Sequence, residues 1–105
     1  MVKIENGDIY YPSGDTFKFS VGRELPFDET DTLRLQITKA EAAKPFIDNI
    51  YKLNVFGEFD VVLAESDTNK LQINDRYMYR LTVVDVDGNI DTEKSGKIFV
   101  EWGVK

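Results

Sequence analysis

The chain contains neither cysteine nor histidine. Without cysteine it can form no disulfide, thiolate nucleophile, zinc–thiolate site or iron–sulfur cluster. Histidine is the usual general base near neutral pH and the commonest metal ligand, so Ser-His-Asp and Cys-His catalysis are excluded as well. We therefore expect a protein that is not an enzyme, with no catalytic residues, no cofactor and no metal site.

Long hydrophobic runs and positive charge are also scarce. No segment approaches the ~20 consecutive apolar residues that span a bilayer, and no apolar run follows Lys3 as it would in a secretory signal peptide. The net charge is −6, with 19 acidic residues against 13 basic ones, whereas nucleic-acid binding depends on lysine and arginine. We expect a chain made in the cytoplasm, with no signal peptide, no membrane insertion and no nucleic-acid partner.

Alternation of apolar and polar residues is the dominant pattern in the 105 residues. A period of two places successive side chains on opposite faces of a sheet. The expected strands lie near residues 3–11, 17–21, 33–38, 51–55, 59–63, 77–83 and 97–102. One-sided alternation favours antiparallel pairing, and about seven strands are typical of an immunoglobulin-like sandwich. The sequence predicts a single all-β domain over residues 1–105, an antiparallel immunoglobulin-like β-sandwich.

Turn residues separate these strands. Residues 12–15, Pro-Ser-Gly-Asp, and the polar segment 22–31 suit connections, while Asp87-Gly88 supplies the positive φ angles of a tight hairpin turn. Residues 39–45 contain good helix formers but no alternation, and Pro45 limits them. They predict a short helical turn or a loop. A second short turn is expected at residues 65–69, where Ser66 could act as its cap.

The carboxylates of residues 85–91, Asp-Val-Asp-Gly-Asn-Ile-Asp, are the strongest candidate for a metal site. Calcium loops gather oxygen ligands around a glycine in this way. If Gly88 is aligned with the invariant glycine of an EF-hand loop, the first ligand position falls on Val83 and the closing glutamate position on Lys94. Neither residue fits, so the segment is interpreted as a polar hairpin tip.

Other constellations also favour a structural interpretation. Glu58, Asp60, Glu65 and Asp67 could in principle supply the paired carboxylates of a glycosidase, but outward strand faces and turns do not raise a carboxyl pKa usefully. The seven glycines are dispersed and match neither a Walker loop nor a dinucleotide fingerprint.

Aromatic residues suggest two further hypotheses. Tyr77 stands at the entry to the penultimate expected strand, where Greek-key sandwiches often carry a tyrosine whose hydroxyl bonds to the backbone upstream; stacking on a ligand is the alternative. Phe27, Phe46, Phe56 and Trp102 fall in connections or at the chain end. Each either plugs an end of the sandwich or is exposed and marks a partner surface, and the sequence leaves both open.

The C-terminal third carries a resemblance. Its pattern comprises Tyr77-Met78-Tyr79, Asp87-Gly88, Thr92 and Ser95-Gly96-Lys97 followed by an aliphatic strand. This resembles the closing pattern of small immunoglobulin-like domains in phage tail and baseplate proteins, and is similar to the N-terminal domain of upper baseplate proteins. Gly14-Asp15-Thr16 and residues 65–68 are similar to two other turns of those domains. Asn74-Asp75-Arg76 differs from the glycine that often precedes their first tyrosine.

The resemblance implies a prophage-encoded virion component, made in a bacterial host, that assembles with other tail proteins or with copies of itself. We expect such a structural module to act through its sheet edges and end loops. The alternative is a stand-alone sandwich that recognises carbohydrate or a cell-surface component. That alternative requires exposed aromatic residues grouped on one face.

Overall fold

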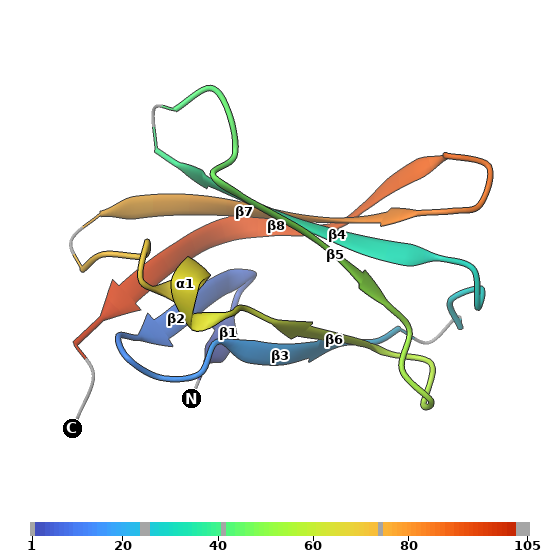
Figure 1. Ribbon diagram of the computed structural model, residues 1–105, viewed down its shortest axis with the longest axis horizontal. Helices are drawn as coiled ribbons and strands as arrows, with labels where there is room; N and C mark the ends of the chain where they lie inside the picture. Colours follow the sequence, from blue (N-terminus) through green and yellow to red (C-terminus); the bar gives the residue numbers. More distant parts are fainter. Residues whose placement is uncertain (1, 24–25, 41, 74, 103–105) are drawn as a thin grey trace.

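The computed structural model describes residues 2–23, 26–40, 42–73 and 75–102. Within them the elements follow in the order β1 (Lys3–Glu5), β2 (Asp8–Pro12), β3 (Lys18–Val21), β4 (Thr32–Lys39), β5 (Ile47–Lys52), β6 (Phe59–Val62), α1 (Glu65–Thr68), β7 (Arg76–Val84) and β8 (Ile90–Glu101). A six-stranded sheet of order β1-β2-β8-β7-β4-β5 faces a two-stranded sheet of β3 and β6 (Figure 1). The predicted all-β sandwich class is confirmed.

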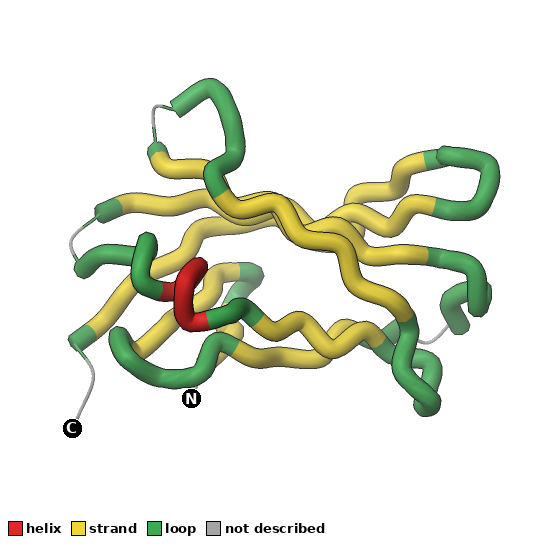
Figure 2. The backbone as a smooth tube through the Cα atoms, in the orientation of Figure 1, coloured by secondary structure: helices red, strands yellow, loops and turns green. Residues whose placement is uncertain are grey.

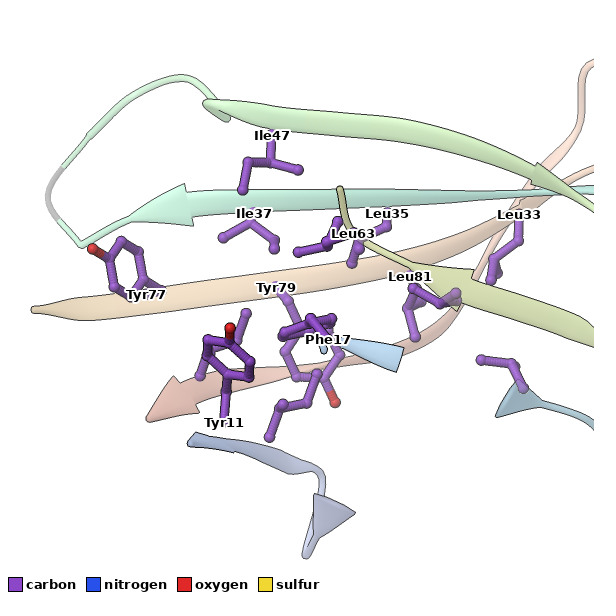
Figure 3. Packing of buried hydrophobic residues seen from close by; sticks show 14 of the residues in the cluster. Tyr11, Phe17, Leu33, Leu35, Ile37, Ile47, Leu63, Tyr77, Tyr79 and Leu81 are labelled. Atoms are coloured by element: carbon purple, nitrogen blue, oxygen red, sulfur yellow. The ribbon is translucent and has the colours of Figure 1, made fainter. Parts of the chain in front are cut away.

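The core lies between the two layers (Figure 3). The large sheet buries alternate residues of its strands, among them Leu33, Leu35, Ile37, Tyr77, Tyr79, Leu81, Ile98 and Val100. The small sheet and its flanks contribute Phe17, Val21, Phe59, Val61 and Leu63. These residues form one cluster, so the period-two pattern identified the inward faces of both sheets.

The N-terminal segment differs from the single strand expected over residues 3–11. It is a hairpin, because Asn6 and Gly7 adopt φ angles of 54° and 83° and reverse the chain between β1 and β2. Asn-Gly is the preferred dipeptide for such a turn. The reversal aligns β2 parallel to β8, with Ile9 opposite Ile98. The prediction of purely antiparallel pairing is therefore wrong for this pair, although the other pairings are antiparallel.

The connection from β4 to β5 takes the loop form of the two that were predicted, but the strand after it begins earlier than expected. Lys39 still belongs to β4, and the described residues between 40 and 46 form a loop rather than a helical turn; Glu41 lies outside the described residues. Sheet pairing dominates here, because the Phe46 amide donates to the Ile37 carbonyl at 3.0 Å and so starts β5 early. Strand β5 consequently spans Ile47–Lys52 instead of residues 51–55.

The second predicted turn forms the short helix α1. Its N-cap residue is Ala64, which makes no side-chain capping bond. Ser66 lies inside the helix and is not the cap, so that detail of the prediction is wrong. The Thr68 hydroxyl donates back to the Glu65 carbonyl at 3.1 Å.

The C-terminal hairpin forms as predicted around the Asp-Gly turn. Val84 pairs with Ile90, and Gly88 has a φ of 85°. Strand β8 is longer than expected because its polar first half also pairs with β7, with a register shift beside Leu81 and Thr82. That shift is a β-bulge, which bends the long hairpin locally.

The carbonyl of Gly7 holds the N-terminal hairpin against the main sheet. It accepts a hydrogen bond from the Tyr79 hydroxyl. A Cβ atom at Gly96 would lie 2.1 Å from the same carbonyl oxygen, closer than non-bonded atoms approach. Only glycine leaves room for this contact, which gives Gly96 of the Ser-Gly-Lys motif a structural role.

Tyr77 forms the predicted tyrosine corner. Its hydroxyl accepts the Gln72 amide N–H at 2.9 Å and lies 3.2 Å from the Lys70 carbonyl oxygen, to which it donates. The ring is buried beside Phe46, with the ring centroids 5.6 Å apart. The ligand-stacking alternative for Tyr77 is therefore wrong, because the ring is enclosed in the core.

We predict that Tyr77→Phe lowers the free energy of unfolding by about 1–3 kcal/mol, since it leaves the Gln72 amide and the Lys70 carbonyl without their partner. Thermal unfolding followed by circular dichroism measures the effect. Tyr10→Phe is the matched control, because the Tyr10 hydroxyl makes no hydrogen bond within the described residues. Equal melting temperatures for Tyr77→Phe and the unmodified chain would contradict the prediction.

Candidate functional site

The four acidic residues considered as a carboxylate pair do not form a cleft. Glu58, Asp60 and Glu65 are exposed, and Asp67 is partly buried. The Asp60 carboxylate accepts hydrogen bonds from the Asn54 amide and the Ser20 hydroxyl, each at 3.1 Å, and these bonds lower its pKa. A lowered pKa suits a fixed acceptor rather than a general acid at neutral pH.

The carboxylates of residues 85–91 are directed to the hairpin itself. One oxygen of Asp85 accepts the amide N–H groups of Asp87 and Asn89, at 2.9 and 2.8 Å. The other accepts the Asn89 side-chain amide at 3.0 Å. The bonds from Asn89 contribute most to lowering the pKa of Asp85. In the part of the chain that the structure describes, no group of three acidic residues is placed to hold a metal ion.

The four aromatic residues left open by the sequence divide into two pairs. Phe27 is buried with its ring centroid 4.8 Å from that of Phe59, and Phe46 packs partly buried against the core. They plug the sandwich. In contrast, Phe56 and Trp102 have relative exposures of 83% and 80%. These two remain candidates for contact with a partner.

Phe56 projects from a fixed loop, residues 54–58, which we call the Phe56 loop. The Asn54 side-chain oxygen accepts the amide N–H groups of Phe56 and Glu58, at 2.8 and 3.1 Å. Gly57, with a φ of 76°, donates to the Asn54 carbonyl. Val55, next to Phe56, is 93% exposed. The loop thus presents two apolar side chains to solvent in a defined conformation.

A second exposed apolar surface lies on the outer face of the large sheet. We call it the basic-aromatic patch; it consists of Tyr10, Arg76, Met78, Lys97 and Phe99. On this face Phe99 lies between Tyr10 and Arg76 in the strand register, and Lys97 lies opposite Met78. The rings of Tyr10 and Phe99 stack with centroids 5.2 Å apart. Met78 and Phe99 remain exposed.

The cations of the basic-aromatic patch are available for a partner. Within the described residues neither Arg76 nor Lys97 forms an ion pair. The nearby Asp75 carboxylate pairs with Lys39 at 3.4 Å, and Asp8 accepts the backbone amide of Lys97 at 3.0 Å. The patch therefore presents positive charge beside apolar side chains.

The patch residues were not singled out by sequence reasoning, although a signal exists. Met78 and Phe99 occupy positions that the alternation assigns to the solvent face, where polar residues are the rule. Apolar side chains that occupy neighbouring outward positions on paired strands mark a contact surface. Recognising this requires the register between β7 and β8, which the hairpin turn alone does not determine because of the bulge.

The chain matches no protein-family model, and searches of curated proteins and of solved structures return no match. Among the described residues, no helix has the length and apolar character needed to cross a membrane. The surfaces just described are therefore interpreted on their own geometry.

We predict that Asp85 makes the stability of the hairpin depend on pH. Its folded-state pKa is lowered, so its contribution is present above the unfolded value of about 4 and is lost as the pH falls through the folded value. Asp85→Asn should flatten the fall in melting temperature on acidification. The control is Asp87→Asn, because the Asp87 carboxylate accepts no hydrogen bond among the described residues. If the melting temperatures of Asp85→Asn and the unmodified chain fell equally on acidification, the role of Asp85 would be disproved.

Proposed function

We propose that the chain is a non-enzymatic assembly module that acts through protein–protein contacts. The observation that carries this proposal is the Phe56 loop, in which Asn54 fixes an aromatic side chain in solvent. A residue whose only role is to stabilise the folded core would be buried and not held in solvent. An aromatic anchor held in its binding conformation avoids much of the ordering cost of association.

The absence of enzymatic activity belongs to the same proposal. The chain lacks histidine and cysteine, and the hydrogen-bonded carboxylates of Asp60 and Asp85 have lowered pKa values. Both are exposed or partly exposed and hold loops in shape. This pattern supports a scaffold rather than a catalyst.

We further propose that the module is immunoglobulin-like. Strands β4, β7 and β8 are neighbours in one sheet, as C, F and G are in that fold, and β3 pairs with β6 as B pairs with E. The tyrosine corner at Tyr77 adds a feature common in such sandwiches. Eight strands were found among the described residues, close to the seven expected.

The phage or prophage tail and baseplate assignment rests on the resemblance of residues 71–100 to the closing pattern of such domains. Two residues of that pattern have structural roles here, since Tyr77 forms the corner and Gly96 admits the Gly7 carbonyl. These roles explain why the pattern suits a small sandwich. The partners proposed are other tail proteins or further copies of the chain.

Carbohydrate recognition remains the second candidate. It would use the exposed ring of Phe99, stacked on Tyr10, as a platform for a sugar. Of the other two exposed aromatic residues, Trp102 directly follows β8, whereas the loop that carries Phe56 joins β5 to β6 at the opposite end of the sandwich from the finish of β8 (Figure 1). Saturable binding on a glycan array, abolished by Phe99→Ala, would favour this candidate over assembly.

We predict that the chain is incorporated into particles through the Phe56 loop. Particles released by inducing the strain that carries the gene would be purified and analysed by mass spectrometry. The unmodified chain and Val86→Asp should be found in them, whereas Phe56→Asp should be lost. Val86 is the matched control because it is 75% exposed at the tip of another loop. Complete particles that lack the unmodified chain would overturn the proposal.

A further inference from the structure

We propose that the Phe56 loop of one copy docks on the basic-aromatic patch of a second copy, so that molecules associate head to tail. This rests on the proposed assembly function and names the partner as the same chain. The contact is heterologous, since it joins two different surfaces.

The two surfaces lie at opposite ends of the molecule. The Phe56 loop joins β5 to β6 at the right end in Figure 1, whereas the patch is formed where β7 begins and β8 finishes, at the left. The molecule is 39 Å long. Figure 2 shows the loops gathered at the two ends of the strands. A chain therefore cannot bring its own loop to its own patch, and a contact between them must join two molecules.

The charges of the two surfaces are complementary. Glu58, in the Phe56 loop, is exposed and forms no ion pair among the described residues. Arg76 and Lys97 of the patch likewise have none. Other loops at the Phe56 end are acidic too, and Asp28 and Asp85 lie close enough to repel each other. A protein of net charge −6 repels its own copies in general, so complementary ends select one mutual orientation.

The apolar parts of the two surfaces also fit chemically. The Phe56 ring can pack between the thioether of Met78 and the ring of Phe99, contacts that sulfur and aromatic groups favour. The cations of Arg76 and Lys97 flank those two side chains in the strand register and can meet Glu58 beside the ring. An aromatic anchor within a polar rim is a common organisation of a protein interface.

Strand addition at the sheet edges formed by β5 and β6, another expected mode of contact, is less well supported. Asp48 of edge strand β5 accepts two hydrogen bonds from Arg34 of the neighbouring β4, at 2.8 and 2.6 Å. The Tyr51 hydroxyl donates to the Val62 carbonyl on the edge of β6 at 2.9 Å. Charged side chains and an occupied carbonyl discourage the addition of another strand.

We predict concentration-dependent association that salt weakens, measured by sedimentation velocity. A head-to-tail contact adds copies into rings or chains. Phe56→Asp should lower the association constant about thirtyfold or more, as loss of a hot-spot residue does, and should therefore be monomeric where the unmodified chain associates. The double variant Arg76→Glu/Lys97→Glu should be monomeric under the same conditions. Val86→Asp and Lys52→Glu, which change other exposed positions outside the contact, should associate like the unmodified chain.

The decisive sample mixes the two monomeric variants. Phe56→Asp retains an intact patch and the double variant retains an intact loop, so together they should form a one-to-one complex that does not grow further. A symmetric contact between identical surfaces would give no such pair. Circular dichroism confirms that each variant is folded.

A monomeric unmodified chain at millimolar concentration and low salt would overturn the inference, as would a mixture that forms no complex. The proposed assembly function has a separate readout. If the chain fails to self-associate but Phe56→Asp is still lost from particles, the partner is another protein and only the head-to-tail contact is wrong. If the unmodified chain is missing from the particles as well, both proposals are wrong.

Discussion

The alternation of strand β7 is the constraint on which the rest of the structure depends. Its inward tyrosines hold separate segments in place: Tyr79 binds the carbonyl of the N-terminal hairpin and Tyr77 binds the segment that follows α1. Its outward residues, Arg76 and Met78, form part of the basic-aromatic patch. One strand therefore organises the core on one face and presents a candidate contact surface on the other.

The same separation of roles extends to the loops. Asp85 and Asn54 both use a side-chain oxygen to bind amide groups of their own loop. At the hairpin this produces an acidic tip, while at the Phe56 loop it holds an aromatic ring in solvent. Polar groups thus fix the shapes of these loops, and in the proposed assembly the apolar side chains that they expose would supply the energy for association.

Period-two alternation predicted the inward faces and the Asp-Gly hairpin because burial on one face of a sheet constrains every second residue. The corner role of Tyr77 was predicted for a similar local reason. The parallel β2–β8 pair was not predicted, because strand alternation does not reveal the reversal at Asn6-Gly7 and pairing partners depend on tertiary packing. The patch was missed since it needs residues from three strands, and the exposure of Phe56 follows from how its loop folds back on Asn54.

Hydroxyl-radical footprinting at low and high protein concentration tests the central claim most directly, because it reports the exposure of individual side chains. The account predicts that Phe56, Met78 and Phe99 lose reactivity together as the concentration rises. Ile50, on the outer face of edge strand β5, and Val86 should keep theirs. Loss of reactivity at Ile50 with Met78 unchanged would contradict the account, since it would place the contact at the sheet edge.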